Sequence, residues 1–232
     1  MSKTNDIFNN CYQSTVSTLS SSLSLKECDA GEYSHIKLSA LLKFDIRQFD
    51  IEGFGNLCIM RYNLGIMKML TVVLTPMLKD LPLLSLDLMI IAGKRKFYAE
   101  FYDLTDNKDD TYNGWINKYN EIIGHYSSLG SFSPSDNWYA PLLSAKAYKE
   151  FKKDRDNECM KLYNDILLKY IAEIKAYPLM SEDLRVGKIA RIKEYSDRLI
   201  DEGGPATDIF KKKIGPNKTR DFFDKVFFAT GR

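Results

Sequence analysis

Asp87 lies in the middle of the apolar stretch "LLSLDLMII" (residues 83–91), where a carboxyl group is unusual. Alternate residues of a strand share a face, so Ser85, Asp87 and Met89 point one way and the leucines and isoleucines between them point the other. A carboxyl group held among apolar neighbours has a raised pKa, because burial disfavours its charged form, and it can then donate a proton near neutral pH. Three interpretations are open: a structural hydrogen-bond acceptor, an outward-facing charge, or a proton donor in a pocket.

Other residue patterns with known chemistry are scarce. The four cysteines are scattered without a CxxC pair, and the chain has only two histidines, His35 and His125. A zinc or iron–sulfur site built from side chains is therefore not expected, and we predict no bound metal or cofactor. The motifs GxSxG, HExxH and GxGxxG do not occur, so hydrolase, zinc-protease and dinucleotide-dependent functions lack support.

Composition excludes several further classes of protein. The chain has 232 residues, 44% of them hydrophobic, and a formal net charge of +2. This length favours one sizeable core, and the balanced charge gives no signal for nucleic-acid binding. No apolar run reaches the length of about 18 residues needed for a membrane span. We therefore expect a soluble, cytoplasmic protein with reduced thiols that binds neither nucleic acid nor membrane.

The elements that must position Asp87 are predicted to be strands. Short apolar and aromatic runs follow one another between Phe44 and Leu104, which predicts about five strands. The runs on either side of Ala92-Gly93-Lys94 read as a hairpin. Because no helical pattern interrupts these runs, the sequence predicts an antiparallel meander.

Helices are expected around this sheet. A polar loop leads into a helix after Asp106, and the Ser/Pro-rich residues 130–141 are typical of a loop that lines a cleft. Three- and four-residue spacing predicts one long helix over 144–177, and Ser181 caps the next helix, which ends at Gly203-Gly204. Two short helices follow, so the fold class is α+β. Residues 1–34 are expected to be a partly mobile N-terminal segment with a short helix, and 35–232 a single domain.

Three blocks of the sequence form a pattern when they are taken together. "DLPLLSLDL" is followed by a glycine-containing turn and "FYDL", then by "FSPSDNW", and then by "GPATDIFKKKIG" before a terminal helix with "VFF". In this order the blocks resemble the ferredoxin-dependent bilin reductases, the family of the phycocyanobilin and phycoerythrobilin:ferredoxin oxidoreductases. The matching residues are Asp80, Leu81, Pro82, Asp87, Asp103, Leu104, Phe132, Ser133, Pro134 and Trp138.

The resemblance implies a fold and a reaction. The fold would be a three-layer α/β/α sandwich with a central antiparallel sheet, and a linear tetrapyrrole such as biliverdin would lie between the sheet and the C-terminal helices. Reduced ferredoxin, or flavodoxin, would supply single electrons, and carboxyl groups and water would supply protons. The protein would then be an oxidoreductase acting on CH–CH groups by a radical mechanism, with Asp87 as the central proton donor.

The same resemblance assigns the other candidate site residues. Thr71 and Ser85 would lie near Asp87, Ser133 and Trp138 would line the substrate pocket, and Arg61 could reach a propionate or face solvent. The second carboxylate would come from the helical side, and the candidates are Asp201 and Glu202.

Two positions depart from the family pattern. Thr71 stands where some members have a histidine, and a threonine hydroxyl cannot shuttle a proton near neutral pH. Ala140 stands where the family has an arginine that anchors a propionate. The leading hypothesis is therefore ferredoxin-dependent bilin reduction. The alternatives are a non-catalytic bilin- or heme-binding protein that keeps the pocket, and a reductase of another open-chain tetrapyrrole.

Overall fold

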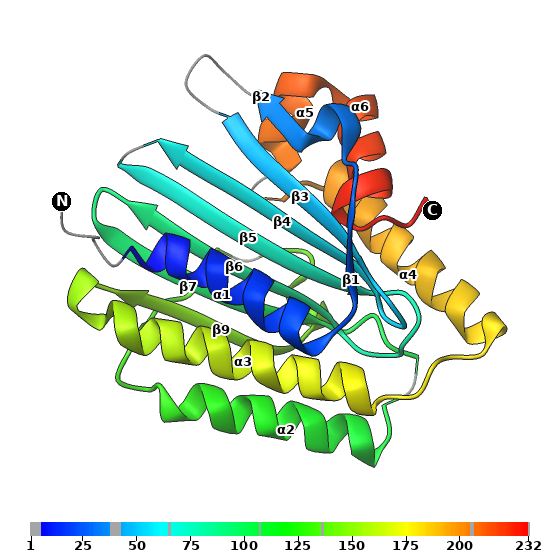
Figure 1. Ribbon diagram of the computed structural model, residues 1–232, viewed down its shortest axis with the longest axis horizontal. Helices are drawn as coiled ribbons and strands as arrows, with labels where there is room; N and C mark the ends of the chain where they lie inside the picture. The colour runs from blue at the N-terminus through cyan, green and yellow to red at the C-terminus, as the bar shows by residue number, and fades with distance from the viewer. Residues whose placement is uncertain are drawn as a thin grey trace.

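An antiparallel sheet forms the centre of the protein in the computed structural model, which describes residues 6–37, 43–64, 66–106, 108–135, 137–204 and 207–231. Within these residues the sheet has nine strands in the order β1-β3-β4-β5-β6-β7-β9-β8, and β2 pairs with β3 (Figure 1). The strands are β1 (Leu25–Cys28), β2 (His35–Lys37), β3 (Lys43–Ile51), β4 (Gly55–Leu64), β5 (Met67–Pro76), β6 (Leu83–Ile91), β7 (Lys94–Tyr102), β8 (Gly130–Ser131) and β9 (Leu143–Phe151).

Helices cover both faces of the sheet, as Figure 1 shows, and the three-layer α/β/α sandwich is confirmed. None of the helices in the described part of the chain has the length and apolarity needed to cross a membrane. One face carries α1 (Ile7–Ser22), α2 (Asp110–His125) and α3 (Asp156–Ala176), and the other carries α4 (Glu182–Asp201), α5 (Thr207–Ile214), α6 (Pro216–Phe222) and a π-helical turn (Phe223–Phe227). Short 3-10 turns span Gly31–Ser34, Ala140–Leu142 and Lys153–Arg155.

Strands β3 to β7 follow one another as the predicted meander. The hairpin between β6 and β7 turns through Ala92 and Gly93, whose φ angles are 47° and 86°. Two-residue hairpins favour positive φ at both central positions, because this twist matches that of the strands. Glycine adopts that conformation without cost, whereas Ala92 does so against its steric preference. The turn fixes which residues of β6 and β7 lie opposite each other.

The sheet face toward α1, α2 and α3 is packed without polar interruption at its centre. Phe101 of β7 contacts the rings of Trp115 and Tyr119 in α2, with centroids 5.4 and 4.3 Å away, and that of Tyr170 in α3 at 6.4 Å. The hydroxyl of Tyr170 donates a hydrogen bond to the carbonyl oxygen of Pro82 at 2.5 Å. Aromatic contacts of this kind supply much of the apolar burial in a core.

Helix α1 forms in the segment with weak helical periodicity, and it packs against α3. Ser14 donates a hydrogen bond to the side-chain oxygen of Asn164 at 2.7 Å, and the hydroxyls of Thr15 and Tyr163 are hydrogen-bonded to each other. The helix places its apolar side in the same core as α3. The expected boundary at residue 34 and the mobility of the segment before it stay predictions.

The single long helix expected over 144–177 is wrong. Residues Leu143–Phe151 are strand β9, which pairs with β7, and the helix begins only at Asp156. The strand shows a period of two, because Ala145, Ala147, Lys149 and Phe151 are buried while the alternate residues 146, 148 and 150 are more exposed. The pairing of this segment with β7 cannot be read from the sequence, and the three- and four-residue spacing of its apolar residues, taken alone, resembles that of a helix.

A buried lysine joins α4 to the turn that precedes β6. Lys188 is fully buried, and its ammonium donates a hydrogen bond to the carbonyl oxygen of Leu81 at 2.6 Å and lies 3.4 Å from a carboxylate oxygen of Asp80. Burial lowers the pKa of this ammonium to about 8, although Asp80 opposes the change. The contact anchors the DLP segment beneath the helical layer.

We predict that Lys188 gives the protein a distinctive pH dependence of stability. The unfolded chain keeps the lysine proton up to its ordinary pKa near 10.5, whereas the folded chain loses it near pH 8. The free energy of unfolding should therefore rise from pH 8 to 10.5, by up to about 3 kcal/mol relative to a Lys188→Met variant. Urea unfolding at each pH measures the difference. The exposed control Lys118→Met should show no such difference. The prediction would be contradicted if the difference in free energy of unfolding between the wild type and Lys188→Met did not change with pH.

Candidate functional site

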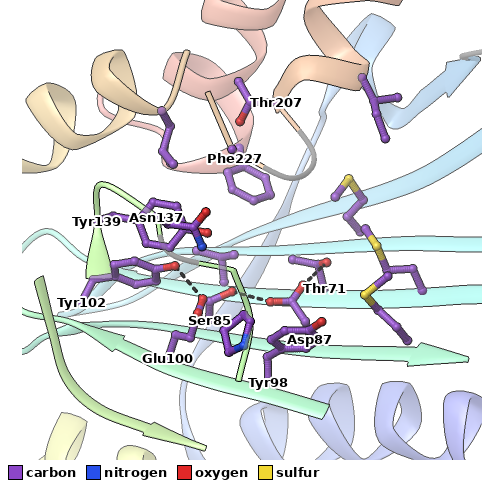
Figure 2. A pocket seen from close by; sticks show the side chains of 18 of the residues that line it. Thr71, Ser85, Asp87, Tyr98, Glu100, Tyr102, Asn137, Tyr139, Thr207 and Phe227 are labelled. Carbon is purple, nitrogen blue, oxygen red and sulfur yellow. Dashed lines mark hydrogen bonds between the residues drawn. The ribbon is translucent and has the colours of Figure 1, made fainter. Parts of the chain in front are cut away.

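A cavity of about 580 Å³ lies between the sheet and the layer formed by α4, α5 and the π-helical turn. Strands β4 to β7 form its floor, and the loop before β9 and the C-terminal helices complete it (Figure 2). The residues 130–141 were predicted to line a cleft, and the cavity-lining residues of the structure include several of them. Aromatic rings supply much of the wall, including those of Tyr98, Phe132, Tyr139, Phe210 and Phe227. A volume of this size suits a small organic ligand.

Asp87 lies on the floor of the cavity, as part of a hydrogen-bonded trio. The register of β5 and β6 places Thr71 directly opposite it, and the Thr71 hydroxyl donates a hydrogen bond to one carboxylate oxygen. The Ser85 hydroxyl, two residues away on the same face, donates to the other oxygen at 3.0 Å (Figure 2). The structure therefore brings together the three polar residues that were predicted to lie close to one another.

The surroundings of Asp87 set its proton affinity. The pKa of its carboxyl group is raised to about 6, mainly by removal from water and also by the nearby charge of Glu100. The hydrogen bonds from Thr71 and Ser85 act in the opposite direction, because they stabilise the charged form. The result is a carboxyl group that exchanges its proton close to neutral pH while facing a cavity.

Glu100 is a second carboxyl group in the cavity, and it was not among the predicted site residues. It lies on β7 opposite Ser85, and it accepts hydrogen bonds from Tyr102 at 2.6 Å and from Tyr148 at 2.8 Å. Burial raises its pKa, and these two hydrogen bonds oppose that change. The hairpin itself carries the missed signal: a two-residue turn at 92–93 pairs 91 with 94, and counting outward brings 85 opposite 100.

The roof of the cavity is held by two buried amides of the sheet. The π-helical turn leaves backbone carbonyls without their usual helical partners. Asn56 of β4 donates hydrogen bonds to the carbonyls of Val226 and Phe227 at 3.0 and 3.1 Å, and Gln48 of β3 donates to that of Lys225 at 3.0 Å. These bonds fix the position of the Phe227 ring above the floor (Figure 2).

Ser133 and Trp138 belong to the loop before β9 but differ in place. Ser133 lines the cavity. Trp138 lies in an adjoining shallow groove, where its indole donates a hydrogen bond to the carbonyl of Gly203 at 3.0 Å and the guanidinium of Arg198 lies 4.1 Å from its ring centroid. Trp138 therefore ties the loop to the end of α4 and is not part of the main cavity wall.

Three other predicted residues lie away from the cavity. Arg61 is on the opposite face of the sheet, with its guanidinium 3.9 Å from the ring centroid of Tyr12 in α1, because odd-numbered positions of β4 face that side. The carboxylate of Asp201 pairs with Arg220 and is 67% exposed. Glu202 pairs with Arg198 and is 44% exposed. Neither acidic residue joins Asp87, because the last turn of α4 points both toward solvent.

The cavity has little positive charge. Among its lining residues in the described ranges, Lys96 is the one cation, and its ammonium lies 4.5 Å from the ring centroid of Phe132 and 3.6 Å from Glu150. The half-buried Ala140 offers no charge at the position where an arginine was expected. The polar groups on the cavity floor are thus mainly carboxyls and hydroxyls.

Comparison with solved structures identifies the class of fold. No family model and no curated protein matches the sequence. The chain nevertheless has the fold of a bilin reductase. It is similar to the crystal structure of selenomethionine phytochromobilin synthase from tomato in complex with biliverdin, with a TM-score of 0.76 and 12% identity over 96% of this chain and 83% of that one. The fold implied by the three sequence blocks is therefore confirmed.

We predict that removing the Thr71 hydroxyl changes the acidity of Asp87. Thr71→Val keeps the side-chain shape but deletes the hydrogen bond to the carboxylate, so the pKa of Asp87 should rise by about one unit above its value near 6. The carboxyl carbon signal of Asp87, followed by NMR as a function of pH, measures this shift. Thr75→Val, on the same face of β5, is the matched control and should leave the titration unchanged. A titration of Thr71→Val identical to wild type would rule out this hydrogen bond as a determinant.

Proposed function

We propose that the protein reduces a linear tetrapyrrole related to biliverdin, with electrons delivered one at a time by ferredoxin or flavodoxin. The observation that carries the proposal is Asp87, a carboxyl group with a pKa of about 6 that faces a cavity of about 580 Å³. General acid catalysis is most effective when the pKa of the donor lies near the working pH. The fold shared with a biliverdin-bound phytochromobilin synthase supports the choice of ligand.

The shape and lining of the cavity support a flat, conjugated ligand. Aromatic rings approach from the sheet, from the loop before β9 and from the C-terminal helices, so a planar molecule can lie between the floor and the ring of Phe227. Stacking and edge contacts with such rings stabilise a conjugated system. The pyrrole N–H groups of a tetrapyrrole would then face hydrogen-bond acceptors on the floor, including Asp87.

No histidine works together with Asp87 in this proposal. Thr71, which replaces the histidine of some bilin reductases, orients the carboxyl group through its hydroxyl but carries no exchangeable charge near neutral pH. The proton delivered to the substrate therefore comes from Asp87 itself. Because the protonated fraction of Asp87 falls above its pKa, turnover should decline as the pH rises through and above 6.

A binding protein without turnover is the second candidate, and two positions favour it. Thr71 stands where a histidine was expected, and Ala140 stands where an arginine that anchors a propionate was expected. A tetrapyrrole would still fit the cavity, with its propionates reaching solvent at the mouth. Assays under reducing, oxygen-free conditions separate a carrier from a reductase.

We predict that Asp87→Asn binds biliverdin but does not reduce it efficiently. The amide keeps the size of the carboxyl group and cannot donate an acidic proton, so turnover should fall at least about 100-fold while the binding affinity stays within about threefold of wild type. A visible-absorbance titration with biliverdin, followed by reduced ferredoxin without oxygen, measures both. Asp50→Asn, at an exposed site on β3, is the control and should behave like wild type.

The possible results separate the candidates. Full turnover by Asp87→Asn would remove Asp87 from the reaction. A wild-type protein that binds biliverdin without reducing it would favour the carrier, and absence of binding by the wild type would overturn both proposals.

A further inference from the structure

Glu100 is a buried carboxyl group that also faces the cavity, and the two hydrogen bonds that it accepts do not explain why it lies there. Its two carboxylate oxygens accept from Tyr102 and Tyr148, and its side chain lines the same cavity as Asp87. Asp87 and Glu100 lie on neighbouring strands and on the same face of the sheet, because Glu100 is two residues beyond Tyr98, the residue opposite Asp87. Side chains in such a diagonal pair are about 7 Å from each other. Two carboxyl groups at this separation influence each other's ionisation.

The chemistry of the proposed reaction requires a second proton. Reduction of one carbon–carbon double bond takes two electrons and two protons and forms two C–H bonds. The electrons come from two molecules of reduced ferredoxin or flavodoxin, each of which is oxidised by one electron. Asp87 accounts for one proton, and neither Asp201 nor Glu202 reaches the cavity floor.

We propose that Glu100 supplies the second proton. The inference rests on the proposed function, and it assigns the two protons of each reduction to two neighbouring carboxyl groups. Asp87 donates to one carbon and Glu100 to the other, and both regain their protons from solvent before the next turnover. Figure 2 shows the two carboxyl groups on the same side of the sheet, facing the space below Phe227.

The groups around Glu100 allow it to hold a proton. Asp87, Tyr98 and Tyr102 approach it from β6 and β7, Tyr148 and Lys146 from β9, and Tyr139 and Tyr195 from the loop and α4. Of these, only Lys146 carries a positive charge, and it favours the ionised form. Burial outweighs it and raises the pKa of Glu100, in agreement with the role of a proton donor.

A purely structural role is the competing explanation. Glu100 would then serve to anchor the hydroxyls of Tyr102 and Tyr148, and its proton would be irrelevant. The two explanations differ in what Tyr148→Phe does. That variant keeps the carboxyl group and removes one of the hydrogen bonds that lower its pKa. If Glu100 is a donor, turnover should persist with its pH profile shifted to higher pH, whereas turnover should be lost if the anchor is what matters.

The experiment compares Glu100→Gln, Tyr148→Phe and the control Glu121→Gln, at an exposed site of α2 on the other side of the sheet, with the wild type. With biliverdin and reduced ferredoxin in the absence of oxygen, Glu100→Gln should bind biliverdin normally, lose at least about 100-fold in turnover and accumulate a partly reduced species in visible spectra. Tyr148→Phe should retain turnover with a pH profile shifted to higher pH, and Glu121→Gln should turn over at a rate close to wild type. Urea unfolding of each variant shows that the fold is retained.

A measurement without substrate tests the coupling of the two carboxyl groups. In the wild type, the NMR titration of the Asp87 carboxyl carbon should be broadened into two steps, because it senses the ionisation of Glu100. In Glu100→Gln it should become a single step at a lower pH than the upper wild-type step. An unchanged titration together with unchanged turnover would overturn the role of Glu100 alone. A wild-type protein that fails to reduce biliverdin would overturn the proposed function, and the donor role with it.

Discussion

The register of the central antiparallel sheet is the constraint on which the site depends. It places Thr71, Asp87 and Tyr98 in one row across β5, β6 and β7, and Ser85 opposite Glu100 in the next. A slip of one residue would turn the Asp87 carboxyl group into the apolar core beneath α3. The hairpin at residues 92–93 and the continuous pairing of β5 with β6 exclude that slip, so the acid chemistry of the floor is a consequence of strand pairing.

The two faces of the sheet divide structure from function. The face beneath α1, α2 and α3 is closely packed, with Phe101 at the centre of an aromatic cluster. On the opposite face, the helical layer packs on the sheet through an apolar cluster that includes Phe44, Tyr195 and Phe210, and it leaves the cavity above the polar floor. Polar contacts add to this attachment. Asn56 and Gln48 hold the π-helical turn, and Lys188 holds the turn before β6. A cavity persists because these attachments lie at its margins.

The sequence predicted the parts whose signal is local. The meander and the face shared by Ser85, Asp87 and Met89 follow from a period of two within single strands. Strand β9 was mistaken for a helix, since its pairing with β7 is a long-range contact that periodicity cannot reveal. Asp201 and Glu202 were favoured because the family resemblance calls for a second carboxylate from the helical side, but sequence does not fix which way the last turn of α4 points. Glu100 needed the hairpin register to be counted across to Ser85.

The contact between α1 and α3 has a consequence for how the chain is made. Ser14 meets Asn164, so the partner of the first helix lies about 150 residues downstream. Until α3 has been synthesised, the apolar side of α1 can make only its contacts with strands β3 to β5, and the surface that α3 covers stays available to chaperones or to wrong partners. Helix α1 must therefore wait for α3, and this face of the sheet closes only after the chain has been synthesised as far as Ala176.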